Sequence, residues 1–339
     1  MLTTFVTHNP EDLDAYFGRA LPALRAVSEV VVNPLDRDLT TLEVIGAAAS
    51  CDMIIAHRST PGEAVLFESS PRLLGFLRCA VDISTIDVGA ASAAGVLIGH
   101  ADKSFVASTA EIALGLMLDL ARNITASTID YRTGVQPAQR TGRQLRGRTA
   151  GIIGYGAIGS QLAAMLRGLG MRVVLCDPFA DAAADGFEQL ELAVLLAESE
   201  FVLPLAALIP STENLIDAAA LAAMQPGAFL INVSRGELLD EDAVAAALDS
   251  GHLGGLAIDV GRALDQRPSA ALAGRPGVIA TPHLGGLTPE NADAQAMSAV
   301  EQVSAIGTGV MPPRVVNVDQ AYRVRTWWAD RTCGASDDR

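Results

Sequence analysis

The chain has 339 residues, of which 50% are apolar, 4% aromatic and 19% charged. This length predicts two domains, and the apolar share is large enough to bury a sizeable core. Asp and Glu outnumber Lys and Arg by 39 to 24, so the formal net charge is −15. Because no local basic patch offsets this charge, we expect no binding to nucleic acid or to anionic membrane surfaces.

The sequence carries no pattern typical of a membrane span, a signal peptide or a zinc site. No apolar run reaches the roughly 18 residues that a spanning helix needs. Residues 1–20 lack the basic start and the apolar stretch of a signal peptide. The four cysteines, at positions 51, 79, 176 and 333, are too widely spaced for a zinc motif, so we expect free thiols. These features predict a soluble, cytoplasmic protein without a bound metal.

Apolar runs of strand length alternate with longer Ala- and Leu-rich runs, a pattern that predicts a parallel α/β architecture. Short buried strands are expected at 51–56 and 95–98. A long apolar helix is expected to end near Arg122, and the spacing of Ser108 and Glu111 predicts a capping box at its start. The polar stretch 131–148 is interpreted as a connecting loop.

From Thr149 the alternation becomes strict. Asp240 is expected to cap a helix over 241–249, which Gly251 follows. Thr288 and Pro289 predict the start of a final helix that runs to about residue 306. After Asn317 no periodicity indicates a further element. Strands are expected near 149–153, 172–176, 200–205, 228–232, 255–259 and 277–280.

The strongest local motif is the glycine fingerprint Gly154-Tyr155-Gly156-Ala157-Ile158-Gly159, which follows an expected strand and opens an expected helix. In this context the glycines permit a tight turn, close approach to a pyrophosphate and close helix–strand packing. Asp177 ends the next strand, where a carboxylate can accept both ribose hydroxyls and repel a 2′-phosphate. We therefore predict that this motif binds NAD rather than NADP. The alternative, a Gly-rich turn that binds no ligand, is disfavoured.

Three further segments have the sequences FLINVSRGELLDED (229–242), GLAIDV (255–260) and VIATPHLGGLTPE (278–290). Together with the fingerprint, they resemble the D-isomer-specific 2-hydroxyacid dehydrogenase family, which includes 3-phosphoglycerate dehydrogenases and glyoxylate/hydroxypyruvate reductases. The resemblance covers residues from about 50 to 317.

The resemblance implies an α/β fold of two parts. A Rossmann-type doubly wound parallel sheet, residues 104–288, is expected to be inserted into a smaller flavodoxin-like α/β substrate domain made of residues 1–103 and 289–339. It also implies a homodimer that forms through the helix at 109–122.

The resemblance further implies an NAD-dependent oxidoreductase that interconverts a D-2-hydroxy acid and its 2-oxo acid by hydride transfer. Arg235 matches the family's substrate-binding arginine, and its planar fork suits a carboxylate. His283 matches the family's proton donor and acceptor, a role that imidazole can fill near neutral pH. Asp259 matches a residue that lies near the nicotinamide carboxamide.

Two sets of site residues follow from this match. Arg58 and Ser59 match the segment that contacts substrate in phosphoglycerate dehydrogenase, whereas His8, His57, His100 and His252 are expected to be structural. The predicted cofactor site contains Gly154, Gly156, Ala157, Ile158, Gly159, Asp177, Ala206, Val233, Ser234, Arg235, Asp259, His283, Gly285 and Gly286. The predicted substrate site contains Arg58, Ser59, Val81, Asp82 and Arg235.

One departure concerns catalysis. The family glutamate that orients the histidine sits five residues after the equivalent of Asp259, and here Leu264 occupies that position. Leucine cannot orient an imidazole, so our hypothesis is that the neighbouring Asp265 replaces the glutamate. The alternative is an NAD-binding redox-sensing or partner-binding module with little catalysis. The presence of both Arg235 and His283 argues against that alternative.

A second departure concerns the substrate. The family's Gly-x-Gly loop, whose backbone holds the substrate carboxylate, aligns with residues 80–82. A carboxylate at Asp82 disfavours a nearby anion unless a cation such as Arg58, Arg78 or Lys103 pairs with it. A solvent-facing Asp82 and an unusual substrate acid both remain open.

Overall fold

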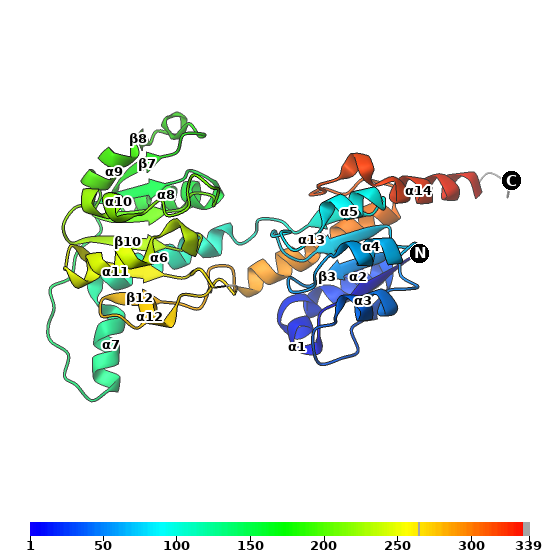
Figure 1. Cartoon of the computed structure of the whole chain (residues 1–339), viewed down its shortest axis with the longest axis horizontal. Coiled ribbons are helices and arrows are strands. Elements are labelled where there is room, and N and C mark those ends of the chain that lie inside the picture. Colours follow the sequence, from blue (N-terminus) through cyan, green and yellow to red (C-terminus); the bar gives the residue numbers. More distant parts are fainter. Residues whose placement is uncertain (264, 335–339) are drawn as a thin grey trace. The chain divides into compact units, whose positions relative to one another are not determined.

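The computed structural model describes residues 1–263 and 265–334 of the chain. The chain divides into two compact units (Figure 1). The first contains Met1–Ser104 and Pro289–Arg339, and the second contains Phe105–Thr288. Each unit has its own parallel sheet and its own hydrophobic cores.

The first unit is built on a five-stranded parallel sheet with the order β2-β1-β3-β4-β5. This is the flavodoxin-like order, in which the chain reverses its direction of progress across the sheet between β1 and β3. Ligands of such folds bind outside the carboxyl ends of the strands at that point. The strands are β1 (Leu2–Val6), β2 (Ser28–Val32), β3 (Met53–Ala56), β4 (Gly75–Arg78) and β5 (Leu97–His100).

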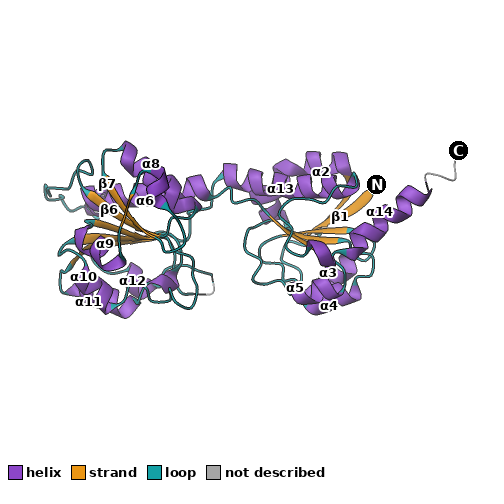
Figure 2. Ribbon diagram, turned by 90° about the horizontal axis from the view of Figure 1, so that it is seen from above, coloured by secondary structure: helices purple, strands orange, loops and turns teal. Residues whose placement is uncertain are grey.

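Helices cover both faces of the first sheet (Figure 2). A short segment of helical turns, 10–20, follows β1. One face packs on a core that includes Val300 and Val303 of the final long helix, so residues from both ends of the chain build this unit. Asn317 accepts a hydrogen bond from the Ile98 N–H (2.8 Å) and donates to the Val96 carbonyl (2.8 Å), which anchors the returning chain beside β5. The helices are α2 (Leu21–Val27), α3 (Thr41–Ala47), α4 (Ala64–Ser69), α5 (Val88–Ala93), α13 (Pro289–Gly307) and α14 (Tyr322–Gly334).

The second unit is built on a seven-stranded parallel sheet with the order β12-β11-β10-β9-β6-β7-β8. The chain adds β7 and β8 on one side of β6 and then β9 to β12 on its other side, as in a Rossmann-type doubly wound sheet. The strands are β6 (Thr149–Ile153), β7 (Arg172–Cys176), β8 (Glu188–Gln189), β9 (Phe201–Pro204), β10 (Ala228–Asn232), β11 (Leu253–Ile258) and β12 (Val278–Ala280).

The helices of the second unit lie on both faces of its sheet (Figure 2). Helices α6 and α8 pack in one core, and α9, α10 and α11 pack in the other. No single helix among the described residues is long and apolar enough to cross a membrane; α6 and α7 meet that test only as a pair, bent by 67°. The helices are α6 (Val106–Arg122), α7 (Ile124–Arg132), α8 (Ala157–Gly168), α9 (Leu192–Glu198), α10 (Ala218–Ala223), α11 (Glu241–Asp249) and α12 (Ala270–Ala273).

Most of the predicted elements are present, one predicted cap is wrong, and two helices were not predicted. Asp240 caps α11, as expected, by accepting a hydrogen bond from the Ala243 N–H (3.1 Å). Ser108 does not cap α6, because the helix begins at Val106 and the Ser108 hydroxyl donates to the Phe105 carbonyl (3.0 Å). The loop expected over 131–148 is present from residue 133, after α7, and the chain beyond Asn317, for which no element was predicted, forms α14.

Candidate active site

The fingerprint loop joins β6 to α8 and has the backbone that a bound pyrophosphate requires. Gly154 has φ +105°, and a Cβ there would lie 2.7 Å from backbone atoms of Leu205 and Ala206. A Cβ at Gly159 would lie 2.1 Å from the Gly154 carbonyl oxygen. A Cβ at Gly156, by contrast, would meet no described atom within 4 Å. Since no described side chain caps α8, its first N–H groups and the open space at Gly156 fit a phosphate.

Asp177 lies directly after β7, beside the fingerprint loop. One of its carboxylate oxygens accepts a hydrogen bond from the Tyr155 N–H (2.7 Å), and the other accepts one from the Phe179 N–H (2.8 Å). Each oxygen keeps a further lone pair, so the carboxylate can also accept hydrogen bonds from a ribose diol. The Tyr155 hydroxyl donates to Asp185 (2.7 Å), a contact that no sequence pattern indicated.

Arg235 lies in the turn that follows β10, and a buried asparagine shapes that turn. The Asn232 side chain donates to the Arg235 carbonyl (2.7 Å) and accepts from the Ser234 N–H (3.0 Å). The Ser234 hydroxyl donates to the Ala206 carbonyl after β9 (3.2 Å), so two predicted cofactor residues meet. The half-buried Arg235 guanidinium donates to the Ser234 carbonyl (2.8 Å). Sequence reasoning missed Asn232, although its position at the strand end just before Arg235 was a signal.

Asp259 follows β11 and holds the loop that carries His283. Its fully buried carboxylate accepts hydrogen bonds from the Thr281 hydroxyl (2.6 Å), the Leu284 N–H (2.7 Å) and the Gly285 N–H (2.7 Å). His283 itself has φ +62°, a conformation that costs a residue with a side chain about 1–3 kcal/mol. The Asp259 hydrogen bonds on both sides of His283 stabilise this strained turn.

The remaining predicted cofactor residues also lie in the second unit. Ala157 and Ile158 form the first turn of α8, and Val233 is buried directly after β10. Gly285 is buried and Gly286 is half-buried in the loop after β12. The predicted residues thus follow β6, β7, β9, β10, β11 and β12. Because all these strands are parallel, their carboxyl ends meet at one edge of the sheet.

Asp265 is exposed and lies between β11 and α12. Its carboxylate accepts a hydrogen bond from the Arg267 N–H (3.1 Å) and lies 3.6 Å from the Arg267 guanidinium. Arg262 fixes the start of this loop by donating to the Leu239 carbonyl (2.8 Å). The catalytic contact between Asp265 and His283 stays a prediction, and Leu264 lies outside the described residues.

The predicted substrate residues of the first unit lie after β3 and β4, at the carboxyl edge of that sheet. Arg58 and Ser59 are exposed, and the Ser59 hydroxyl forms a hydrogen bond with Nδ1 of His57 (2.8 Å). Val81 is half-buried, whereas Asp82 is exposed and accepts a hydrogen bond from the Ser84 N–H (2.9 Å).

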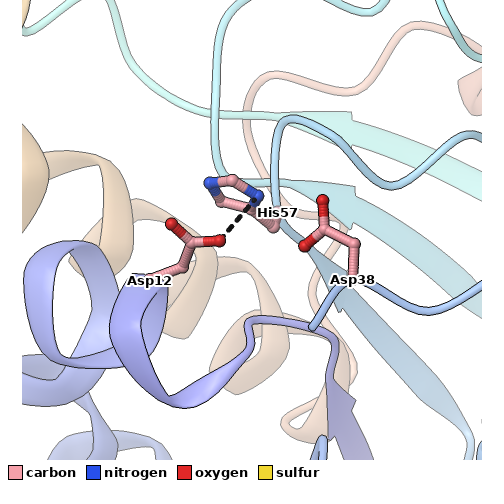
Figure 3. A group of neighbouring side chains, drawn as sticks. All are labelled: Asp12, Asp38 and His57. Carbon is pink, nitrogen blue, oxygen red and sulfur yellow. Dashed lines mark ion pairs between the residues drawn. The ribbon is translucent and has the colours of Figure 1, made fainter. Parts of the chain in front are cut away.

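Three further side chains meet at this edge: Asp12, Asp38 and His57 (Figure 3). One ligand atom from each lies within 4.8 Å of the others, a spacing that a metal ion could use. The Asn9 amide, however, donates to both carboxylates, at 2.8 Å to Asp12 and 3.2 Å to Asp38. Burial lowers the pKa of His57, while the two carboxylates act in the opposite direction. Asp12 ends the short helix α1 (Pro10–Asp12), whereas Asp38 and His57 lie in two separate loops, so no sequence spacing could have indicated the cluster.

Behind His57 lies His8, which is 1% exposed. The two imidazole rings pack edge to face, with centroids 4.9 Å apart. Neither ring nitrogen of His8 has a hydrogen-bond partner among the described residues. Burial, together with the neighbouring His57 and Arg78, lowers the pKa of His8 to about 3. His8 is therefore neutral at physiological pH and packs as an apolar ring.

Comparison with known proteins decides the family. Residues 114–285 match the family model for the NAD binding domain of D-isomer specific 2-hydroxyacid dehydrogenases. The chain is also 33% identical to the (S)-sulfolactate dehydrogenase of Chromohalobacter salexigens over 292 residues. This matched region is 82% of this chain and 94% of that protein. The chain belongs to the D-isomer specific 2-hydroxyacid dehydrogenase family. The predicted family and the predicted cofactor, NAD, are thereby confirmed.

Other members of the family are similar over most of this chain. The D-3-phosphoglycerate dehydrogenase of Mycobacterium leprae is 34% identical over 281 residues, which are 82% of this chain and 53% of that protein. The chain thus spans about half the length of the curated 3-phosphoglycerate dehydrogenases that it matches.

Solved structures of the 2-hydroxyacid dehydrogenase family show the same fold. A Polaromonas structure described as an NAD-binding D-isomer specific 2-hydroxyacid dehydrogenase has a TM-score of 0.83 at 26% identity, covering 93% of this chain and 99% of that one. The D-lactate dehydrogenase of Escherichia coli has a TM-score of 0.77 at 25% identity, covering 93% and 100%. The predicted fold class is confirmed.

Proposed function

We propose that this 2-hydroxyacid dehydrogenase family member is an NAD-dependent oxidoreductase that interconverts a D-2-hydroxy acid and its 2-oxo acid. One observation carries the proposal. Arg235 follows β10 and His283 follows β12, at the sheet edge where the fingerprint loop follows β6. A cation for the substrate, a proton donor and a pyrophosphate loop therefore share one edge of the second unit.

The chemistry needs few groups. Bound NAD would supply the hydride chemistry at C2 of the substrate, and the fingerprint loop and Asp177 would hold it. Arg235 binds the substrate carboxylate through its planar fork and polarises the C2 carbonyl. His283 gives a proton to the C2 alkoxide during reduction and takes it from the hydroxyl during oxidation. Asp265 is proposed as the carboxylate that orients the His283 ring, and Asp259 as a neighbour of the nicotinamide carboxamide.

The same proposal assigns substrate binding in the first unit to Arg58, Ser59, Val81 and Asp82. It also includes a cytoplasmic homodimer that forms through the helix region 109–122. Exposed apolar side chains on and after this helix support the dimer: Leu118 is 39%, Ile124 54% and Ile129 53% exposed.

A second candidate is an NAD-binding module with little catalysis. It is favoured by the presence of leucine where the family has its histidine-orienting glutamate, at position 264. Both candidates bind NAD, so binding of the cofactor alone does not separate them.

Turnover of oxo acids tests the proposal. NADH absorbance would be followed with glyoxylate, pyruvate, hydroxypyruvate, longer 2-oxo acids, 3-phosphohydroxypyruvate and 3-sulfopyruvate at several pH values. Arg235→Ala and His283→Ala are expected to abolish turnover while NADH still binds. The matched controls are Arg275→Ala, which removes an ion pair with Asp249, and His252→Ala, which removes a hydrogen bond to the Leu221 carbonyl. NADH binding without turnover of any acid would favour the second candidate.

A further inference from the structure

The side chain of Arg78 is buried, although arginine is normally exposed. It ends β4, is 1% exposed and is the largest fully buried side chain in the part of the chain that the structure describes. Removal of a guanidinium from water is strongly unfavourable unless hydrogen bonds or an opposite charge compensate. Burial lowers the pKa of Arg78 to about 10, so the group is still a cation at neutral pH. Such a group requires a structural or functional reason.

The hydrogen bonds of Arg78 supply that reason. Its guanidinium donates to the His57 carbonyl, to the Thr60 carbonyl (2.7 Å) and to the Thr85 hydroxyl (3.0 Å). All three acceptors are neutral groups, so hydrogen bonding offsets part of the cost of burial. The Asp82 carboxylate also acts to raise the pKa of Arg78, which favours its charged form. The guanidinium therefore donates to two backbone carbonyls and one hydroxyl of other segments, while the buried Nε of Arg78 has no hydrogen-bond partner among the described residues.

These acceptors belong to two different loops. His57 and Thr60 lie in the loop 57–63 between β3 and α4, and Thr85 lies in the loop 79–87 between β4 and α5. The two loops also pair directly, since Gly62 donates to the Thr85 carbonyl (3.0 Å) and accepts from the Asp87 N–H (2.8 Å). The Arg78 side chain thus adds hydrogen bonds to both loops, beside the direct backbone hydrogen bonds between them.

We propose that Arg78 is a positioning residue for substrate binding, which fixes the loop that carries Arg58 and Ser59 against the loop that carries Val81 and Asp82. The inference rests on the proposed function, because those four residues are the proposed substrate contacts in this unit. Arginine suits the role because its fork reaches acceptors in both loops at once, whereas a lysine ammonium is a single point of donation.

Two variants test the role, with a matched control. Arg78→Lys keeps the charge and loses the fork, and Arg78→Met loses both. The control is Arg323→Met, because Arg323 likewise donates to two carbonyls of this unit, those of Ser70 (2.6 Å) and Leu73 (3.1 Å). Those carbonyls precede β4, at the opposite end of the strand from Arg78.

Hydrogen–deuterium exchange and steady-state kinetics give separate readouts. In both Arg78 variants the amides of 57–63 and 79–87 are expected to exchange faster, while in Arg323→Met they keep the wild-type rate. The KM for the oxo acid is expected to rise about 10- to 100-fold in Arg78→Met, since displaced binding groups lose orientation. The KM for NADH should stay unchanged.

Wild-type exchange in both loops of Arg78→Met, or an equal rise in KM in Arg323→Met, would overturn the proposal. If Arg78→Met does not fold, Thr85→Val removes one acceptor at nearly constant shape. Thr85→Val should speed hydrogen–deuterium exchange in 79–87. It should also raise the KM for the oxo acid, by a smaller factor than Arg78→Lys does. If neither the exchange rate nor the KM changed, the result would contradict the proposed role of Arg78. A wild-type enzyme that turns over no oxo acid would refute the proposed function, while the exchange rates would still decide whether Arg78 holds the loops.

Discussion

The Asp259 carboxylate accepts a hydrogen bond from the Gly285 N–H at 2.7 Å, two residues beyond His283. Together with its bonds to Thr281 and Leu284, this contact means that the loop of the proposed proton donor depends on one buried side chain. The strained backbone of His283 makes that dependence stronger, because the turn needs external support.

Asp259→Asn is expected to destabilise the protein by about 2–3 kcal/mol, because an amide NH2 would face backbone N–H donors in a buried site. Turnover should fall as well, since the His283 loop loses its anchor. Urea unfolding and steady-state kinetics measure the two effects. Asp249→Asn is the control, because it removes an exposed ion pair worth at most about 1 kcal/mol. Equal stability of the two variants would contradict the prediction.

Two alanine substitutions in the fingerprint loop should separate folding from cofactor binding. Gly159→Ala places a Cβ 2.1 Å from the Gly154 carbonyl, so both the melting temperature and NADH affinity should fall. Gly156→Ala meets open space in the protein, so it should lower stability by only about 1 kcal/mol, the usual cost of alanine at a helix N-cap. Its NADH affinity should nevertheless fall at least about tenfold, because the methyl group occupies the space of the pyrophosphate. Thermal melts and NADH fluorescence titrations check both; normal NADH affinity in Gly156→Ala would exclude this placement of the phosphates.

The buried imidazole of His8 predicts a pH dependence of stability. Its pKa is about 3 in the folded protein, against an ordinary value of 6.5, so the unfolded chain binds more protons between these values. Stability is therefore full above pH 6.5 and falls as the pH drops toward 3. The His8 share of this loss should be about 2 kcal/mol between pH 7 and pH 5.

Urea unfolding of the His8→Leu variant measures that share. The variant should retain its stability at pH 7, since leucine replaces a ring without hydrogen bonds, and should lose less stability on acidification than the wild type. His252→Leu serves as the control, because His252 is only half-buried and hydrogen-bonds to the Leu221 carbonyl. An identical pH dependence in His8→Leu and the wild type would rule out His8 as the source.

Asp265→Asn tests the proposed partner of His283. If the carboxylate orients the imidazole and favours its protonated form, the variant should retain NADH binding, lose activity and shift its pH–rate profile for reduction to lower pH. The pH–rate profile with a good oxo acid is the measurement. Glu213→Gln, which removes a neighbouring exposed carboxylate near Arg262, is the control. A profile identical to that of the wild type would eliminate Asp265 from this role.

Sequence patterns were most informative where a residue's environment is set by its immediate neighbours. The strands 149–153, 172–176 and 228–232 have the predicted bounds, because each is a short apolar run that is buried in the sheet. The fingerprint and the start of the last long helix at Pro289 are equally local features.

Predictions were wrong or absent where distant contacts decide. The Ser108–Glu111 spacing also occurs inside helices, so it could not show that α6 begins earlier. Helix α14 is rich in arginine and has no clear apolar stripe, although Trp328 anchors it to the Ile306 carbonyl (2.8 Å). The hydrogen bonds of Arg78 join residues 18 and 21 positions apart through loop geometry that no spacing rule contains.

The construction of the first unit from both ends of the chain has a consequence for biosynthesis. Its core needs Val300 and Val303 of α13, and β5 is anchored by Asn317. During translation the second unit, Phe105–Thr288, is complete before these residues leave the ribosome. The amino-terminal strands therefore keep an exposed apolar face until α13 has been synthesised. A chain that stops after Thr288 would keep this face exposed, which would make it prone to aggregation and proteolysis.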